Sequence, residues 1–372
     1  MKFMRISEIH IYQHDLPVVG GEFRTSQTSM ASFDTTIIEI VTENGLVGYG
    51  ETCPLGPVYQ PHHAAGARAA LRHMGPYLIG LNALGIECVR DAMDEALSGH
   101  NYAKAAVDIA LWDLAGKFYG ARVCDLLGGA KQETVPSYYA IGVMEPEAAA
   151  STARQKQAEG YRRLQLKVGG RTLDIDIAAI RKVHETLQPH VTLAVDVNRG
   201  WTSRDAVTVS QACRDLSFVL EQPCDTLEEI ASLRGRVCHA IFIDESTEDL
   251  STVVRAVGQR ICDGFSLKVT RLGGISTMRT VRDVCRAANL PMTCDDAWGG
   301  DIIAAACNHI GATVSPRLLE GVWLAAPYIG EHYDPENGIG VEHGHIRVPD
   351  GPGLGVQPDT AVWGPPTASY GG

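Results

Sequence analysis

Five charged side chains, each at the end of an apolar, strand-like run, constrain this chain more than any other feature. They are Lys167 in LQLKVGG, Asp196 in LAVDVN, Glu221 in FVLEQP, Asp244 in IFIDES and Lys268 in GFSLKV. Successive members lie 29, 25, 23 and 24 residues apart. One strand, one helix and two short loops take about that many residues. The spacing therefore predicts parallel βα units that bring all five side chains to one rim of a barrel.

The alternation of strands and helices begins near Val135 and continues through the rest of the central chain. Strand-like runs lie near residues 137, 165, 194, 219, 242, 266, 292 and 314. Eight parallel strands separated by helices close a (β/α) barrel. We therefore predict an α/β fold whose barrel spans residues 131–328.

The chain before the barrel has a different pattern. Asn44-Gly45 is a hairpin turn between two alternating runs, and residues 62–80 and 87–120 have helical periodicity. These features predict an α+β capping domain over residues 1–130. The Pro- and Gly-rich segment 329–372 is expected to pack back on this cap.

Substrate specificity is expected to come from two loops of the cap, at about residues 19–32 and 52–60, and from the ends of the seventh and eighth barrel strands. The first loop is rich in Gly, Ser and Thr. A surface connection and a lid that closes over the substrate are both consistent with this composition.

Composition narrows the classes of partner. A net charge of −12 argues against nucleic acid as a partner and mildly against anionic membranes.

Ten cysteines occur without a C-x-x-C pair, which predicts reduced thiols in a cytoplasmic protein. No apolar run is long enough to span a bilayer.

The three acidic members of the series predict a metal centre. Converging carboxylates raise each other's pKa unless a cation neutralises them. Asp196, Glu221 and Asp244 offer only oxygen ligands, which Mg²⁺ prefers and which Mn²⁺ can also use. No His or Cys occupies a matching position, which argues against zinc.

The two lysines predict proton transfer. Gln165 and Lys167 share one face of their strand, and Lys268 ends the strand on the opposite side of the barrel. A nearby dication and a closed lid would lower the pKa of a lysine toward the range of a general base. Such a pair can remove the proton next to a carboxylate, and the enediolate that forms needs a metal ion and a donor such as Gln165. The alternative is that the lysines only neutralise the three acids.

These residues resemble the enolase superfamily, specifically its muconate-lactonizing-enzyme-like subgroup, which uses lysine bases and Mg²⁺. The resemblance rests on GLVGYGE, on AKAAVDIALWDLAGK and on the strand ends described above. It implies a cap and a barrel, with Lys167 and Lys268 as the catalytic pair. It also implies that Asn198 and Glu245 lie beside the ion and the lysines, and that the chain forms a homo-oligomer between a dimer and an octamer. The K-x-K pattern of the subgroup reads Gln165-Leu166-Lys167 here, and the seventh strand, PMTCDDAWGGD, lacks a histidine.

The expected substrate is a small carboxylate. Where dipeptide epimerases of the subgroup have Asp-x-Asp, this chain has LLEGVWLAAPY with Trp323, and an aromatic face suits a quaternary ammonium. Together with Tyr59, Asp295 and Asp296, Trp323 resembles the set found in enzymes that invert the 2-position of proline betaine or 4-hydroxyproline betaine. Packing between the barrel and the tail is the alternative role for Trp323.

We therefore expect a racemase or 2-epimerase. A cis-3-hydroxy-L-proline dehydratase would use the same enediolate and is the nearest alternative. A muconate cycloisomerase and a barrel that only binds a ligand are more distant ones.

Overall fold

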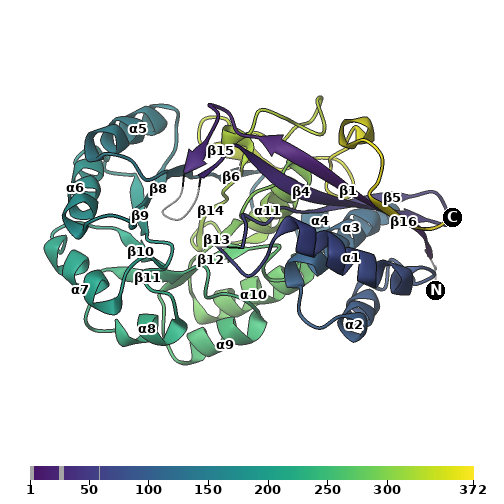
Figure 1. Ribbon diagram of the computed structural model, residues 1–372, viewed down its shortest axis with the longest axis horizontal. Helices are drawn as coiled ribbons and strands as arrows, with labels where there is room; N and C mark the ends of the chain where they lie inside the picture. Colours follow the sequence, from purple (N-terminus) through teal and green to yellow (C-terminus); the bar gives the residue numbers. More distant parts are fainter. Residues whose placement is uncertain (1–3, 25–28, 58) are drawn as a thin grey trace.

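The computed structural model describes residues 4–24, 29–57 and 59–372, and Figure 1 shows a cap beside a barrel. The cap sheet has the strand order β16-β1-β4-β5, and its last strand in sequence pairs with its first. Its strands are β1 (Ile6–Pro17), β4 (Ser32–Thr42), β5 (Val47–Thr52) and β16 (Ala368–Gly371). The first and the last strand of the described chain therefore both belong to the cap.

Three helices complete the cap: α1 (Ala64–Leu78), α2 (Ile86–Ala96) and α3 (Asn101–Tyr119). They enclose a core of their own with the aliphatic face of the sheet. The helical stretch expected at 87–120 is therefore two helices, with Gly99 and His100 at positive φ between them. The predicted turn at Asn44-Gly45 joins β4 to β5, with Gly45 at φ 80°.

The barrel is a single eight-stranded parallel sheet in sequence order. Its strands are β7 (Tyr139–Ile141), β8 (Arg163–Lys167), β9 (Thr192–Asp196), β10 (Val219–Glu221), β11 (Ala240–Ile243), β12 (Gly264–Lys268), β13 (Met292–Asp295) and β14 (Leu319–Gly321). A parallel bridge between Ser137 and Val322 joins the first strand to the last and closes the ring. The expected α/β fold is thus the one observed.

Helices alternate with these strands and cover the outside of the barrel (Figure 1). They are α5 (Pro146–Ala158), α6 (Leu173–His184), α7 (Ser203–Ala212), α8 (Leu227–Ser232), α9 (Leu250–Gly258), α10 (Ile275–Ala288) and α11 (Asp301–Thr313). The loops after β9, β10 and β11 end in side-chain caps from Thr202, Thr226 and Asp249. Because a capped helix begins at a fixed residue, these caps also fix the lengths of the loops that follow the three acidic strand ends.

The eighth strand was expected near residue 314, and this prediction is wrong. Helix α11 continues to Thr313, because its small apolar residues stay buried through that point. A turn then follows, in which the amides of Leu318 and Leu319 donate to the Ser315 carbonyl. The β-branched pair Thr313-Val314 had the composition of a strand but ends a helix.

Short elements join the two parts. Strand β6 (Thr134–Pro136) pairs with β15 (His345–Arg347), and α4 (Val123–Leu126) precedes β6. Two 3-10 turns, η1 (Ala326–Tyr328) and η2 (Thr360–Trp363), lie in the last part of the chain.

Within the expected loop at 19–32, β2 (Phe23–Arg24) pairs with β3 (Ser29–Met30), while residues 25–28 lie outside the described part of the chain. Among the residues that the structure describes, no helix has both the length and the apolar character needed to cross a bilayer.

Candidate active site

The strand register brings the charged residues to the interior of one rim. Lys167 pairs with Asp196, and Asp196 pairs with Glu221, so these three side chains leave adjacent strands on the same face. Asp244 comes one residue after β11. Strands β8 and β12 are four places apart in a ring of eight. Lys167 and Lys268 therefore start from opposite walls of the barrel.

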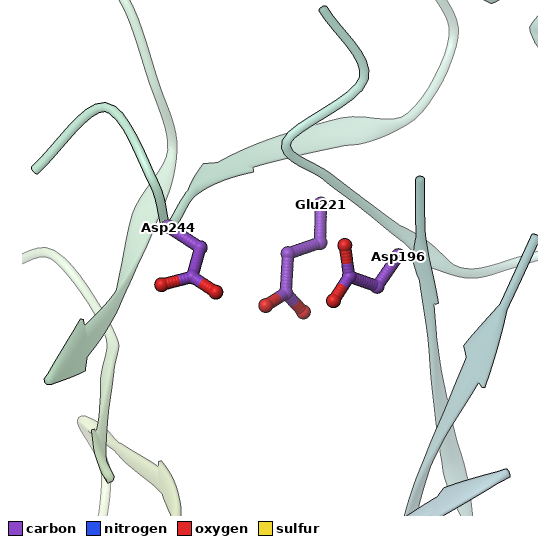
Figure 2. Close-up of side chains that lie close together, drawn as sticks. All are labelled: Asp196, Glu221 and Asp244. Atoms are coloured by element: carbon purple, nitrogen blue, oxygen red, sulfur yellow. The ribbon is translucent and has the colours of Figure 1, made fainter. Parts of the chain in front are cut away.

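The three acidic residues converge as a possible metal site. Each offers one carboxylate oxygen, and these oxygens lie within 4.8 Å of one another at fully buried positions. Figure 2 shows Glu221 between Asp196 and Asp244, with all three carboxylates facing a common space. Burial, together with the charges of Asp196 and Asp244, raises the pKa of Glu221 to about 7. An oxygen-only, acidic donor set of this kind fits Mg²⁺ or Mn²⁺.

The two lysines contact opposite ends of the acidic set. Lys167 donates to Asp196, and the Nζ of Lys268 lies 3.1 Å from Asp244. Burial alone would lower the pKa of each lysine, but the neighbouring carboxylates outweigh it and raise both pKa values. The expected direction was the opposite one. Lowered lysine pKa values were predicted from the sequence because a dication was assumed beside the lysines.

Three further predicted residues bond directly to the acidic set, and a fourth, Glu245, bonds to one of these three. Gln165 donates from Nε2 to both oxygens of Glu221 at 3.0 Å. Asn198 donates to Asp196 at 3.2 Å and to Glu245 at 3.0 Å. The hydroxyl of Tyr59, from the cap, donates to Asp244 at 2.9 Å. Burial, with Asp244 and Asp196 nearby, raises the pKa of Glu245 to about 8.

Asp295 and Asp296, two of the predicted substrate contacts, accept hydrogen bonds from the protein itself. Asp295 accepts from the Tyr138 hydroxyl at 2.8 Å and from the Trp323 amide at 2.7 Å. Asp296 accepts from both the amide and the hydroxyl of Thr270, each at 2.7 Å. Burial raises the pKa of Asp295 to about 6.

Trp323 contributes its ring to an aromatic cluster. The ring lies edge-on to Trp298, with centroids 5.4 Å apart, and 5.5 Å from that of Tyr328. Trp298 in turn stacks on Phe33 of the cap at 3.6 Å. Only 8% of Trp323 is exposed.

Sequence reasoning missed two residues of the site. The buried guanidinium of Arg271 donates to Asp244 from Nη2, and within the described residues its Nε and Nη1 have no hydrogen-bond partner. The side-chain oxygen of Gln222 accepts from the amide of Asp244 at 2.9 Å. Closeness in sequence to predicted site residues could have identified both. Arg271 lies three residues after Lys268, and Gln222 directly follows Glu221.

The space beside Lys268 is small. A cavity of about 20 Å³ is lined by Tyr59, His62, Lys268 and Asp296 among other residues. About 10–15 Å³ of this kind of volume holds one water molecule, so a substrate with a ring fits here only if the lining side chains move.

Comparisons with known proteins agree with this architecture. The family model described as "Enolase C-terminal domain-like" matches residues 147–362. The chain belongs to the enolase superfamily. The model described as "Mandelate racemase / muconate lactonizing enzyme, N-terminal domain" matches residues 8–128. The resemblance stated from the motifs is thereby confirmed.

Among similar proteins is a cis-3-hydroxy-L-proline dehydratase from Roseibium aggregatum, 39% identical over 99% of this chain and 100% of that protein. An N-succinyl-L-Arg/Lys racemase from Bacillus cereus is 27% identical over 95% of each chain. A superfamily member from Roseovarius nubinhibens, solved in complex with magnesium, superposes with a TM-score of 0.95. It is 32% identical and covers 99% of this chain and 100% of its own. Like these relatives, the chain is an enzyme.

Proposed function

We propose that this enzyme removes the proton next to the carboxylate of a small, proline-type substrate, with Lys167 and Lys268 as its two acid/base groups. The observation that carries this proposal is the position of one lysine at each end of a buried, oxygen-only carboxylate triad. A general base on one side of a carbon and a general acid on the other are what proton transfer at that carbon requires.

Asp196, Glu221 and Asp244 would hold Mg²⁺. The ion supplies positive charge that stabilises the enediolate formed when the proton leaves. Gln165 and Asn198 orient the ligand carboxylates by donating hydrogen bonds to them. The lysine that faces the substrate proton must be neutral to accept it, so its ion pair with Asp196 or Asp244 has to be broken before reaction.

Dehydration of a 3-hydroxyproline is the outcome we favour, because the dehydratase relative matches nearly the whole chain. In this reaction one lysine takes the C2 proton, and the electron pair of that bond forms C2=C3. The C3–O bond breaks, and the leaving hydroxyl takes a proton from the second lysine and departs as water.

Inversion at C2 of proline betaine or 4-hydroxyproline betaine is the second candidate. The aromatic cluster around Trp323, close to Asp296, favours it, because aromatic faces stabilise a quaternary ammonium by about 1–2 kcal/mol. In this case the second lysine returns a proton to the opposite face of C2, and nothing leaves.

One experiment separates these outcomes. Wild-type enzyme with Mg²⁺ is incubated in D₂O with cis-3-hydroxy-L-proline, L-proline betaine or 4-hydroxyproline betaine, and the products are identified by NMR. A dehydrated product supports the first candidate, and deuterium at C2 with inversion supports the second. No exchange and no turnover with any of the three would contradict the proposed substrate class.

The roles of the lysines have their own test. We expect Lys167→Ala and Lys268→Ala each to lower turnover by about 10²–10⁴-fold, the usual contribution of a general acid or base. Lys104→Ala is a matched control, because Lys104 is also a buried lysine paired with an aspartate, here Asp94 of the cap at 2.5 Å. If both active-site variants turn over substrate at the wild-type rate, the assignment is wrong.

A homo-oligomer and a cytoplasmic location stay predictions. Light scattering of the purified protein checks the first, and cell fractionation checks the second.

A further inference from the structure

Two buried carboxylates of the cap hold the two barrel loops that adjoin Lys268. Glu51 lies in β5 and Asp108 lies in the middle of α3, and neither is exposed. Each accepts a hydrogen bond from a backbone amide at the start of a barrel helix, Asp108 at α10 and Glu51 at α11. Free amides and the helix dipole make such a position favourable for a negative charge.

Asp108 contacts α10 very closely. Its Oδ2 accepts from the amide of Ser276 at 3.0 Å, and Trp112, one turn later on α3, donates to the Ser276 hydroxyl at 2.9 Å. Gly274 has φ 109°, and a Cβ placed there would lie 2.4 Å from Oδ2 of Asp108. The loop before α10 therefore packs directly on this carboxylate.

That loop is short and begins at Lys268. The amide of Leu272 donates to the Lys268 carbonyl at 3.2 Å, and the amide of Gly274 donates to the Val269 carbonyl at 2.9 Å. A hydrogen-bonded turn of five residues therefore separates Lys268 from Gly274, which packs on Asp108.

Glu51 holds the next loop in the same way. It accepts from the Gly300 amide at 2.8 Å and from the Ile303 amide at 3.2 Å. Asp296 in this loop accepts from Thr270 in the loop after Lys268. The cap therefore restrains two loops that are also bonded to each other.

The loop after Lys167 is held differently. Asp176 of α6 accepts from the amide of Gly169 at 3.0 Å and from Nε of Arg171 at 2.7 Å. Asp176 belongs to the barrel itself. The two lysines are thus positioned by carboxylates from different parts of the fold.

We propose that Asp108 is a positioning residue for Lys268, through which the cap acts on one of the two proton-transfer faces. This inference rests on the proposed acid/base roles of the lysines.

The first test needs no substrate. Full-length wild-type, Asp108→Ala and Asp108→Asn enzymes, each with Mg²⁺, are treated briefly with acetic anhydride, and acetylation of Lys268 and Lys167 is quantified by peptide mass spectrometry. We expect Asp108→Ala to raise the Lys268/Lys167 labelling ratio severalfold. Asp108→Asn should raise it less, because the amide oxygen can still accept from Ser276. It also keeps the test valid if the alanine variant does not fold.

Asp176→Ala is the matched control and should lower the same ratio by loosening the Lys167 loop. Equal changes at both lysines in Asp108→Ala and Asp108→Asn, or no change in either variant, would overturn the proposal.

The second test measures the rate of proton exchange at C2. Deuterium incorporation at C2 is measured from L- and D-proline, which have no C3 hydroxyl to expel and therefore suit either candidate function, and Lys167→Ala and Lys268→Ala assign each enantiomer to its lysine. Asp108→Ala should slow the exchange that depends on Lys268 by about 100-fold, the cost of a displacement of about 1 Å, and should change the other exchange much less. If the lysine variants exchange like wild type, the proposed function fails, while the labelling ratio still decides whether Asp108 positions Lys268.

Discussion

Gln165 contacts the proposed metal site through Glu221 without itself belonging to the carboxylate triad. Its amide donates to both oxygens of Glu221, at the place where related sequences of the subgroup have the first lysine of K-x-K. A neutral donor orients the carboxylate without adding a positive charge next to the cation site. Groups that orient ligands in this way commonly contribute about 10–100-fold to metal affinity.

We therefore predict that Gln165→Leu weakens Mg²⁺ binding by about 10-fold or more, measured by isothermal titration calorimetry. Gln157→Leu is the control, because Gln157 is also buried but bonds to the carbonyls of Ala153 and Thr186 outside the site. An unchanged Mg²⁺ affinity in Gln165→Leu would show that the amide has no part in holding Glu221.

At this scale the sequence predicted the positions of the charged side chains, and the resemblance implied Asn198 and Glu245 as their neighbours, but Arg271 was not expected. Each of the five lies at the end of an apolar strand or directly after it, so its position followed from strand spacing alone. Arg271 reaches Asp244 because the turn after β12 folds back over the rim, and no periodic pattern encodes that path. For the same reason, the sequence did not reveal that Asp295 and Asp296 would be bonded to Tyr138, Trp323 and Thr270.

Among the helices and strands, β5 and α3 show the closest backbone packing at a glycine. A Cβ on Gly50 would lie 1.7 Å from the carbonyl oxygen of Ala106, and one on Gly48 would lie 2.5 Å from that of Ala110. Glycines two apart on a strand face the same side, and here they meet small residues on the helix. The motif GLVGYGE thus brings Glu51 to the barrel by letting the strand lie against α3.

Gly50→Ala should accordingly destabilise the protein by about 3 kcal/mol or more, since overpacking against backbone has no easy relief. Gly258→Ala, at the end of α9 where no other described part of the chain comes within 4 Å of the added Cβ, should be neutral or slightly stabilising. Urea unfolding followed by circular dichroism compares the two. Equal stability of both variants would mean that the strand can move away from α3 at little cost.

The secondary-structure prediction was inaccurate where the local residue types favoured one structure and the tertiary packing stabilised another. Thr313-Val314 has strand-like residues, yet burial on all sides keeps the helix intact to that point. The helical stretch at 87–120 was correct in type, but its interruption at Gly99 and His100 depends on backbone conformations that the periodicity does not show.

For the molecule as a whole, two buried acids make the free energy of unfolding depend on pH. The pKa of Glu221 is raised to about 7 and that of Glu245 to about 8, above the values expected in the unfolded chain. The stability from these two groups is fully present below their unfolded pKa values and is lost as the pH rises through about 7 to 8. A bound cation would offset this loss, because it favours the charged carboxylates.

We predict that Mg²⁺ raises the melting temperature more at pH 8 than at pH 6, where it must displace protons from the site. Differential scanning fluorimetry with Mg²⁺ or with EDTA measures the difference at each pH. Glu221→Gln serves as the control and should show a much smaller response to Mg²⁺. An equal response of the wild-type protein at both pH values would contradict the proposed coupling.

The ion pairs of Asp196 and Asp244 with Lys167 and Lys268 affect the reactivity of the two lysines when no cation is bound. An amine held in an ion pair keeps its proton and cannot act as a base, so Asp196 and Asp244 hold both lysines in the protonated form. If these carboxylates bound a cation, as the proposed function requires, Lys167 and Lys268 would lose the ion pairs that keep them protonated. Under that proposal, the lysines would become available as bases only once the charge that stabilises the enediolate was in place.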